Sequence, residues 1–195
     1  EQECIDSSSF IGLAPLVLKG MAETVRFKDA VIHDFVSETD TETHQQFACF
    51  SIDLSDKTTY IAFRGTDDTL TGWQEDFCLS YETVPAQISA VNYLNKHIKR
   101  GRKYRIGGHS KGGNLAVYSV LSLKRNRSNI LSIYSNDGPG LYFRYLTEEQ
   151  KKAFAYFEPR IIKIIPEFDV FGMMFSRIPN TIVIKSDAFT LLQHS

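Results

Sequence analysis

Cysteine pairs, a charge bias and long apolar runs are all missing from this sequence of 195 residues. Its three cysteines, Cys4, Cys49 and Cys78, are an odd number with no pair at metal-ligand spacing, so we expect reduced thiols and a cytoplasmic protein. The formal net charge of −1 argues against nucleic-acid partners, which require a positive field. No stretch reaches the roughly 18 apolar residues of a membrane span, so we expect no stable membrane insertion.

The length of the chain favours one domain over residues 1–195, since a compact domain of this size buries about 70% of its unfolded surface without disulfides. We expect residues 1–29 to form an N-terminal helical cover, with helices at Phe10–Lys19 and Met21–Phe27. The chain begins with Glu1 instead of Met, so we expect a fragment of a longer protein. Whether a signal segment precedes it is left open by the sequence.

Strand-like and helix-like segments alternate from residue 30 onward, which is typical of an α/β domain. We expect strands at Ala30–Ser37, Gln46–Leu54, Thr58–Phe63, Lys103–Ile106, Ile130–Ser135, Ile161–Ile165 and Thr181–Lys185. The short links between the first three strands favour antiparallel pairing. Helices are expected at Gln87–Lys99 and at Thr147–Tyr156, where Thr147 and Gln150 can form a capping box.

One pentapeptide, Gly108-x-Ser110-x-Gly112, stands between a strand-like run and a helix-like run. A hydroxyl becomes a good nucleophile when a sharp strand-to-helix turn holds it out of the backbone beside a base. Both glycines fit such a turn, because a Cβ at either position would meet the neighbouring strand or helix. We therefore predict that Ser110 is the nucleophile of a serine hydrolase. The alternative is a Gly-Ser loop whose serine caps the helix.

A nucleophilic serine needs a histidine that accepts its proton. His33 and His44 precede Ser110, against the order serine, acid, histidine that accompanies this strand-turn-helix motif. His109 directly precedes the serine, so its side chain should point away from the serine hydroxyl and cannot accept its proton. We therefore predict His194, in a loop after the last strand, as the base. A surface histidine near the end of the chain is the alternative.

The histidine in turn needs a carboxylate that fixes its tautomer. Asp169 fits best, because it follows the strand Ile161–Ile165 and apolar neighbours should bury it. Asp137 is the alternative acid, although its Asn-Asp-Gly-Pro-Gly setting explains an aspartate by turn formation alone. Asp187, only seven residues before the predicted base, is the third candidate.

The negative charge that develops on an attacked carbonyl oxygen must meet preorganised N–H donors. The residue after the nucleophile commonly supplies one of them, here the amide of Lys111. The second should come from a loop after an earlier strand. Gly65 lets the chain turn after Thr58–Phe63, so we expect the amide of Thr66 to be that donor. A plain strand-ending turn, with Arg64 paired to a carboxylate, is the alternative.

Three separate segments together resemble the class 3 lipase group of the α/β-hydrolases, and more closely a set of uncharacterised bacterial proteins related to it. Tyr60–Thr66, with Trp73 and Asp76 downstream, is similar to the lipases' Phe-Arg-Gly-Ser/Thr oxyanion loop. The Gly-His-Ser-Lys-Gly-Gly run at 108–113 resembles their nucleophile elbow, and 165–170 resembles the strand end that carries their acid.

The resemblance implies an α/β-hydrolase-like, mixed and mostly parallel sheet with helices on both faces. It also implies Ser110 as nucleophile, Asp169 as acid, His194 as base, and the amides of Thr66 and Lys111 as oxyanion hole. Neither a metal nor an organic cofactor is implied. We expect an esterase or lipase-like hydrolase whose partner is a small acyl ester. The sequence indicates no oligomeric state.

Departures from the lipases bear on the substrate. Lys111 replaces an apolar residue, the lipases' secretory disulfides have no counterpart, and the segment Asp67–Pro85, where the lipases have their lid, is acidic. These features argue against a secreted triglyceride lipase. Two other functions stay open: a non-catalytic protein of this fold that binds a ligand or partner, and a thioesterase or amidase that uses the same residues.

Overall fold

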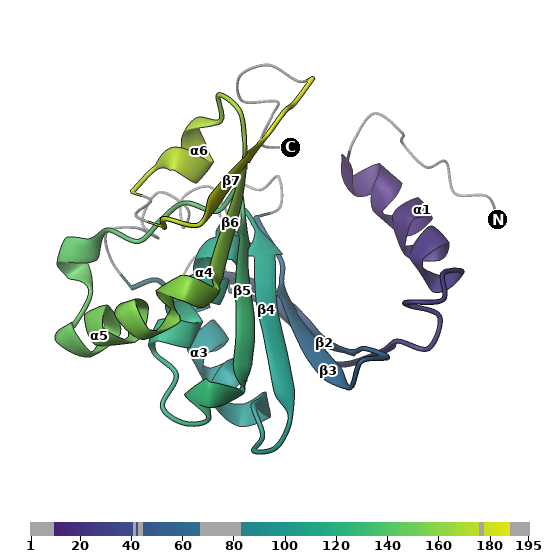
Figure 1. The fold of residues 1–195 in the computed structure, drawn as a ribbon, viewed down its shortest axis with the longest axis horizontal. Coiled ribbons are helices and arrows are strands. Elements are labelled where there is room, and N and C mark those ends of the chain that lie inside the picture. Colours follow the sequence, from purple (N-terminus) through teal and green to yellow (C-terminus); the bar gives the residue numbers. More distant parts are fainter. Residues whose placement is uncertain (1–9, 41, 43–44, 67–82, 176–177, 188–195) are drawn as a thin grey trace.

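Seven strands of the chain form one sheet in the order β1-β2-β3-β4-β5-β6-β7 (Figure 1). The computed structural model describes residues 10–40, 42, 45–66, 83–175 and 178–187, without the side chains of 10–14. The strands are β1 (Val31–Asp40), β2 (Gln45–Asp53), β3 (Thr58–Phe63), β4 (Lys103–His109), β5 (Ile130–Asn136), β6 (Ile161–Pro166) and β7 (Thr181–Ile184). Neighbours from β1 to β3 are antiparallel and those from β3 to β7 are parallel, so the predicted mixed, mostly parallel sheet is confirmed.

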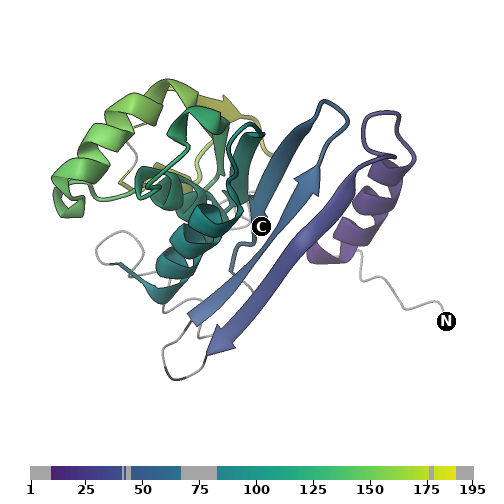
Figure 2. The ribbon, with the colours of Figure 1, turned by 90° about the horizontal axis from the view of Figure 1, so that it is seen from below.

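Helices lie on both sides of this sheet (Figure 2). They are α1 (Phe10–Ala22), α3 (Pro85–His97), α4 (Lys111–Leu121), α5 (Glu148–Phe157) and the short α6 (Val170–Met173). The helices α3, α4 and α5 cover one face of the sheet, and α1 lies on the opposite side, beyond the edge strand β1. The core cluster forms under the first group and includes the fully buried side chains of Leu94, Ile106, Leu115, Ile133 and Phe157.

Local sequence explains most of these elements. The predicted capping box is present at α5, where the Thr147 Oγ1 accepts a hydrogen bond from the Gln150 amide at 3.2 Å. The expected second N-terminal helix, Met21–Phe27, is wrong: α1 runs as one helix through Gly20 to Ala22, and turns follow it. Within the described ranges, no helix is long and apolar enough to cross a membrane.

Strand ends place the candidate site residues side by side. Because β3 to β6 are parallel, their carboxyl ends meet at one edge of the sheet. Backbone bonds extend the pairing past the strands: the Ser110 amide donates to the Asn136 carbonyl at 2.9 Å, and the Asp137 amide donates to the Ile164 carbonyl at 2.7 Å. The residues that follow β3, β4, β5 and β6 therefore share this edge.

Candidate active site

Ser110 occupies a strained turn between β4 and α4. Its backbone has φ 53° and ψ −127°, and a non-glycine residue with positive φ is uncommon. Its side chain makes no capping hydrogen bond to the first turn of α4, so the alternative of an ordinary serine cap does not hold. A strained backbone at the residue between strand and helix is typical of a nucleophile elbow, and the role of Ser110 as nucleophile stays a prediction.

The two glycines of the motif are required by close backbone packing. A Cβ on Gly108 would lie 2.6 Å from the Gly112 carbonyl carbon, and a Cβ on Gly112 would overlap the Phe63 carbonyl oxygen. Real Cβ atoms essentially never approach other heavy atoms as closely as either contact requires. The start of α4 therefore packs directly on the end of β3, which leads into the predicted oxyanion loop.

This loop adjoins the nucleophile. A Cβ on Gly65 would lie 2.9 Å from the His109 carbonyl oxygen and 3.6 Å from the Ser110 Cβ. Thr66 follows at once and is half-buried. Lys111 is the first residue of α4, and its side chain is buried at 1% exposure. Thr66 and Lys111 thus come from the two chain segments that meet at Ser110, and their role as oxyanion donors stays a prediction.

Both leading acid candidates are buried at the same edge. Asp169 is 1% exposed, and its Oδ2 accepts a hydrogen bond from the Gly172 amide at 2.7 Å at the start of α6. Its neighbours Phe168 and Val170 are exposed, so capping and packing bury Asp169, not the apolar flanks. Asp137 follows β5, is 4% exposed and has φ 52°. The geometry leaves both candidates for the acid open.

Asp187, the third candidate, is exposed after β7. The predicted base, His194, lies outside the described residues, as do Trp73, Asp76 and most of the acidic segment 67–85. The roles given to His194 and to that segment stay predictions.

Lys163 is a charged residue beside the site that no sequence pattern pointed to. It lies on β6 between Ile161 and Ile165, on the buried side of the strand, and is 0% exposed. Its Nζ donates a hydrogen bond to the Gly138 carbonyl at 2.6 Å. Burial lowers the pKa of Lys163 to about 8, although the Asp137 and Asp169 carboxylates act in the opposite direction.

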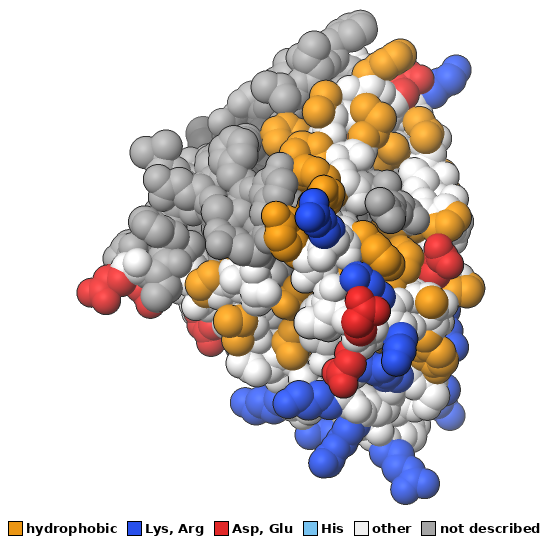
Figure 3. Space-filling model, turned by 90° about the vertical axis from the view of Figure 1, so that its left-hand side faces the viewer, with side chains coloured by type: hydrophobic (Ala, Val, Ile, Leu, Met, Phe, Trp, Pro, Cys, Tyr) orange, Lys and Arg blue, Asp and Glu red, His pale blue; other side chains and the backbone are white. Residues whose placement is uncertain are grey.

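Apolar surface borders the acid end of the site. Phe168, Val170 and Met173 are 76%, 59% and 54% exposed. Hydrophobic side chains are visible over much of this side of the molecule (Figure 3). A cavity of about 290 Å³ opens beside α6, and its lining includes Lys163, Ile165, Gly172, Met173 and Ile178. Apolar groups can therefore be accommodated next to Asp169.

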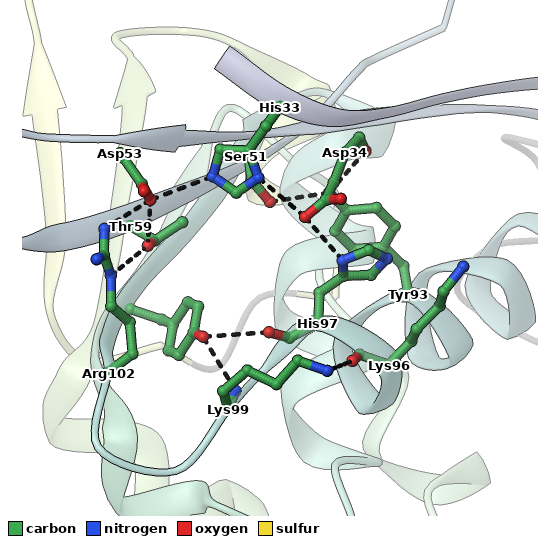
Figure 4. Close-up of polar contacts among 11 residues, drawn as sticks. His33, Asp34, Ser51, Asp53, Thr59, Tyr93, Lys96, His97, Lys99 and Arg102 are labelled. Atoms are coloured by element: carbon green, nitrogen blue, oxygen red, sulfur yellow. Dashed lines mark hydrogen bonds and ion pairs between the residues drawn. The ribbon is translucent and has the colours of Figure 1, made fainter. Parts of the chain in front are cut away.

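His33 and His97 belong to a different cluster, in which Asp34 links β1 to α3 (Figure 4). The Asp34 Oδ2 lies 2.9 Å from both the His33 Nδ1 and the His97 Nδ1. The same cluster joins Asp53, at the end of β2, to Arg102, just before β4. Ser110 follows the other end of β4, seven residues or about 23 Å along the strand. This cluster is therefore not part of the candidate active site.

The described side chains include no group of three His, Cys, Asp or Glu residues that could hold a metal ion. The described part of the site instead offers a hydroxyl in a strained turn, a loop beside it and two buried carboxylates. These groups are suited to acyl transfer.

Comparison with known proteins adds a family and a fold. The model of the Mbeg1-like family matches residues 21–195. No curated protein matches the sequence. The M37 lipase structure is similar at 20% identity and a TM-score of 0.50, over 82% of this chain and 63% of the lipase. This likeness shows an α/β-hydrolase-like fold, and the chain spans less than two thirds of that lipase.

Two further solved structures score lower. The Rhizomucor miehei lipase in its propeptide complex matches at 16% identity and a TM-score of 0.46, over 74% of this chain and 51% of the lipase. The Pyrobaculum calidifontis esterase matches at 14% identity and a TM-score of 0.40, over 90% of this chain and 80% of the esterase.

Proposed function

Because the chain belongs to the Mbeg1-like family and has an α/β-hydrolase-like fold, we propose that it is a serine hydrolase that cleaves a small acyl ester. The observation that carries this proposal is Ser110, whose backbone is strained and adjoins the Gly65 loop and whose side chain makes no capping hydrogen bond. Strain of this kind persists where the surrounding structure imposes it, and it clusters at functional sites.

In the proposed reaction, the Ser110 Oγ attacks the ester carbonyl carbon while His194 accepts the hydroxyl proton. The amides of Thr66 and Lys111 stabilise the oxyanion of the tetrahedral intermediate. His194 then donates its proton to the leaving alcohol, and an acyl-enzyme remains on Ser110. A water molecule, deprotonated by His194, attacks the acyl carbon, releases the acid and restores the serine.

The carboxylate partner of His194 is proposed to be Asp169, with Asp137 as the alternative. Its role is to hold the imidazole in one tautomer and to stabilise the imidazolium. The exposed apolar side chains of Phe168, Val170 and Met173 favour a lipid-like or acyl substrate, because they lie within four residues of Asp169 in the chain. No cofactor enters this mechanism.

A fluorophosphonate probe tests the proposal, since it reacts with activated serines. We expect stoichiometric labelling of Ser110 in the wild type, none in Ser110→Ala, and normal labelling in the matched variant Ser128→Ala, whose serine is exposed away from the site. His194→Ala and substitution of the true acid by Asn should slow labelling by about 10³-fold or more. Comparison of Asp169→Asn with Asp137→Asn identifies the acid.

A folded wild-type protein that the probe leaves unlabelled would contradict the proposal and would instead fit the non-catalytic alternative. If the protein is labelled, a panel of ester, thioester and amide substrates with one common acyl group separates an esterase from a thioesterase or amidase. The proposal expects the ester to be turned over fastest.

A further inference from the structure

Besides Lys111 at the start of α4, three buried charged side chains lie on β6 or just after β5 and β6. Asp137, Lys163 and Asp169 are 4%, 0% and 1% exposed. Buried ions are costly unless opposite charges and hydrogen bonds compensate them. The proposed reaction uses one carboxylate, so the second carboxylate and the ammonium need a separate explanation.

The Asp137 and Asp169 carboxylates both contact Gly172. The Asp169 Oδ2 accepts a hydrogen bond from the Gly172 amide at 2.7 Å. A Cβ on Gly172 would overlap the Asp137 Oδ1, so the Asp137 carboxylate packs against the same residue. Two like charges in one buried place repel each other, so both carboxylates stay ionised only beside a compensating positive charge.

The ammonium of Lys163 lies beside this pair. Its Nζ bonds to the carbonyl of Gly138, the residue that follows Asp137. On the neighbouring strands, Ser135 of β5 and Thr181 of β7 face Lys163 in register, and neither titrates near neutral pH. Among the described residues, the titratable groups that act on the ammonium are the Asp137 and Asp169 carboxylates.

We propose that Lys163 is a positioning residue of the candidate active site, whose ammonium keeps both Asp137 and Asp169 ionised. This inference rests on the proposed function. One ammonium beside two carboxylates leaves one net negative charge, which suits a neighbouring imidazole that becomes an imidazolium during the reaction. Without Lys163, the cluster takes up a proton near neutral pH, and the carboxylate that must orient His194 is neutral for part of the time.

The effect of pH on Lys163→Met separates this role from simple packing. In the variant, the acidic limb of kcat/KM for a neutral short-chain chromogenic ester should move up by about 1–3 pH units. We expect kcat/KM to fall at least about tenfold near pH 6 and to stay within about threefold of wild type near pH 8.5, because one pH unit is a tenfold change in protonation. A packing defect would lower kcat/KM by the same factor at both pH values.

Removal of one negative charge should rescue the variant. The double variant Lys163→Met/Asp137→Asn has a single carboxylate at the site and should regain the wild-type acidic limb. If Asp137 is the acid, Lys163→Met/Asp169→Asn should be the double variant that recovers. The matched control is Lys124→Met, whose side chain is exposed after α4, and its pH profile should equal that of the wild type.

A second readout needs no activity. A carboxylate with a raised folded-state pKa binds more protons in the native than in the unfolded state, so stability falls as pH rises toward that pKa. The urea midpoint of Lys163→Met should therefore fall, relative to wild type, between about pH 5 and pH 7.5, and that of the Lys163→Met/Asp137→Asn variant should not.

These results distinguish the possible failures. An unlabelled, inactive wild type overturns the proposed function, while the urea midpoints still test whether Lys163 compensates the carboxylates. An active wild type whose Lys163→Met variant keeps the same pH profile overturns the positioning role. If Lys163→Met does not fold, a folded Lys163→Met/Asp137→Asn variant supports the proposal, and an unfolded one refutes it because packing, not charge, then decides.

Discussion

Substitution of Gly112 by alanine tests the packing that presents Ser110. In most helices this change stabilises by up to about 1 kcal/mol, because alanine is the better helix former. Here the new Cβ would overlap the Phe63 carbonyl oxygen and lie 2.9 Å from the Phe63 carbonyl carbon and 3.1 Å from that of Arg64. These neighbours are backbone atoms of the end of β3 and the loop after it, so they cannot rotate away.

Overpacking of this kind costs about 1–3 kcal/mol, which exceeds the helix-propensity gain over most of that range. After the helix-propensity gain of about 1 kcal/mol is subtracted, the net cost is up to about 2 kcal/mol. At about 2–4 °C per kcal/mol for a chain of this size, Gly112→Ala should melt up to roughly 8 °C below wild type. The matched control is Gly20→Ala in α1, where nothing lies within 4 Å of the new Cβ. We expect that variant to be as stable as wild type or up to about 1 kcal/mol more stable.

The same overlap should displace the Gly65 loop from Ser110. A misplacement of about 1 Å can cost a hundredfold in rate, so fluorophosphonate labelling of Gly112→Ala should slow by about that factor even where the protein is fully folded. Circular dichroism during heating gives the stability, and time-resolved labelling gives the rate. A Gly112→Ala protein that melts and labels like Gly20→Ala would refute the close packing of α4 on β3.

Three further substitutions test other parts of the structure. Burial lowers the pKa of His33, but its hydrogen bonds to Asp34 and Asp53 outweigh this effect and raise the pKa above 6.5. The contribution of protonated His33 to the free energy of unfolding is therefore complete below about pH 6.5 and is lost as pH rises through the folded-state pKa. The pKa of the Asp34 and Asp53 carboxylates is lowered from 3.8, so their contribution to the free energy of unfolding is lost at acidic pH. His33→Ala should therefore cost most near pH 5.5, at most about 1 kcal/mol for such exposed groups, and less near pH 8.5, as urea titrations at both values will show. Thr147→Ala removes the cap of α5 and should lower the unfolding free energy by about 1 kcal/mol, whereas an unchanged urea midpoint would argue against the capping box. Asn114→Ala leaves the buried amide of Gln87, which donates to the Asn114 Oδ1 at 2.9 Å, without this bond and should cost about 1–3 kcal/mol by the same assay. An unchanged urea midpoint would mean that a water molecule accepts the Gln87 hydrogen bond in place of the Asn114 Oδ1.

Local chemistry made much of the fold predictable. The elbow motif combines a strand-like run, glycines and a helix-like run within a few residues, so Ser110 could be placed at the turn between β4 and α4 from sequence alone. The capping box of α5 and the antiparallel pairing of the first three strands also follow from short-range patterns. Such signals need no knowledge of distant contacts.

Features that depend on distant contacts could not be predicted. Lys163 alternates with isoleucines on β6, and the two carboxylates that act on its ammonium, Asp137 and Asp169, come from other segments. Strand β1 runs to Asp40, three residues beyond the predicted Ser37, and its pairing with β2 shifts register between His33 and Val36, a stretch that includes Asp34 at φ 53°. The hydrogen bond of Asp34 with His97, from α3, is not visible in the sequence of β1.

We propose that the strained turn makes Ser110 a nucleophile that carries the acyl group. Rapid mixing with an excess of a p-nitrophenyl ester, an acid quench and mass spectrometry of the peptide that contains Ser110 test it directly. We expect a burst of nitrophenol equal to the amount of enzyme and one acyl group on Ser110. Nitrophenol release by folded protein with an acyl group on another residue, or no release at all, would contradict it.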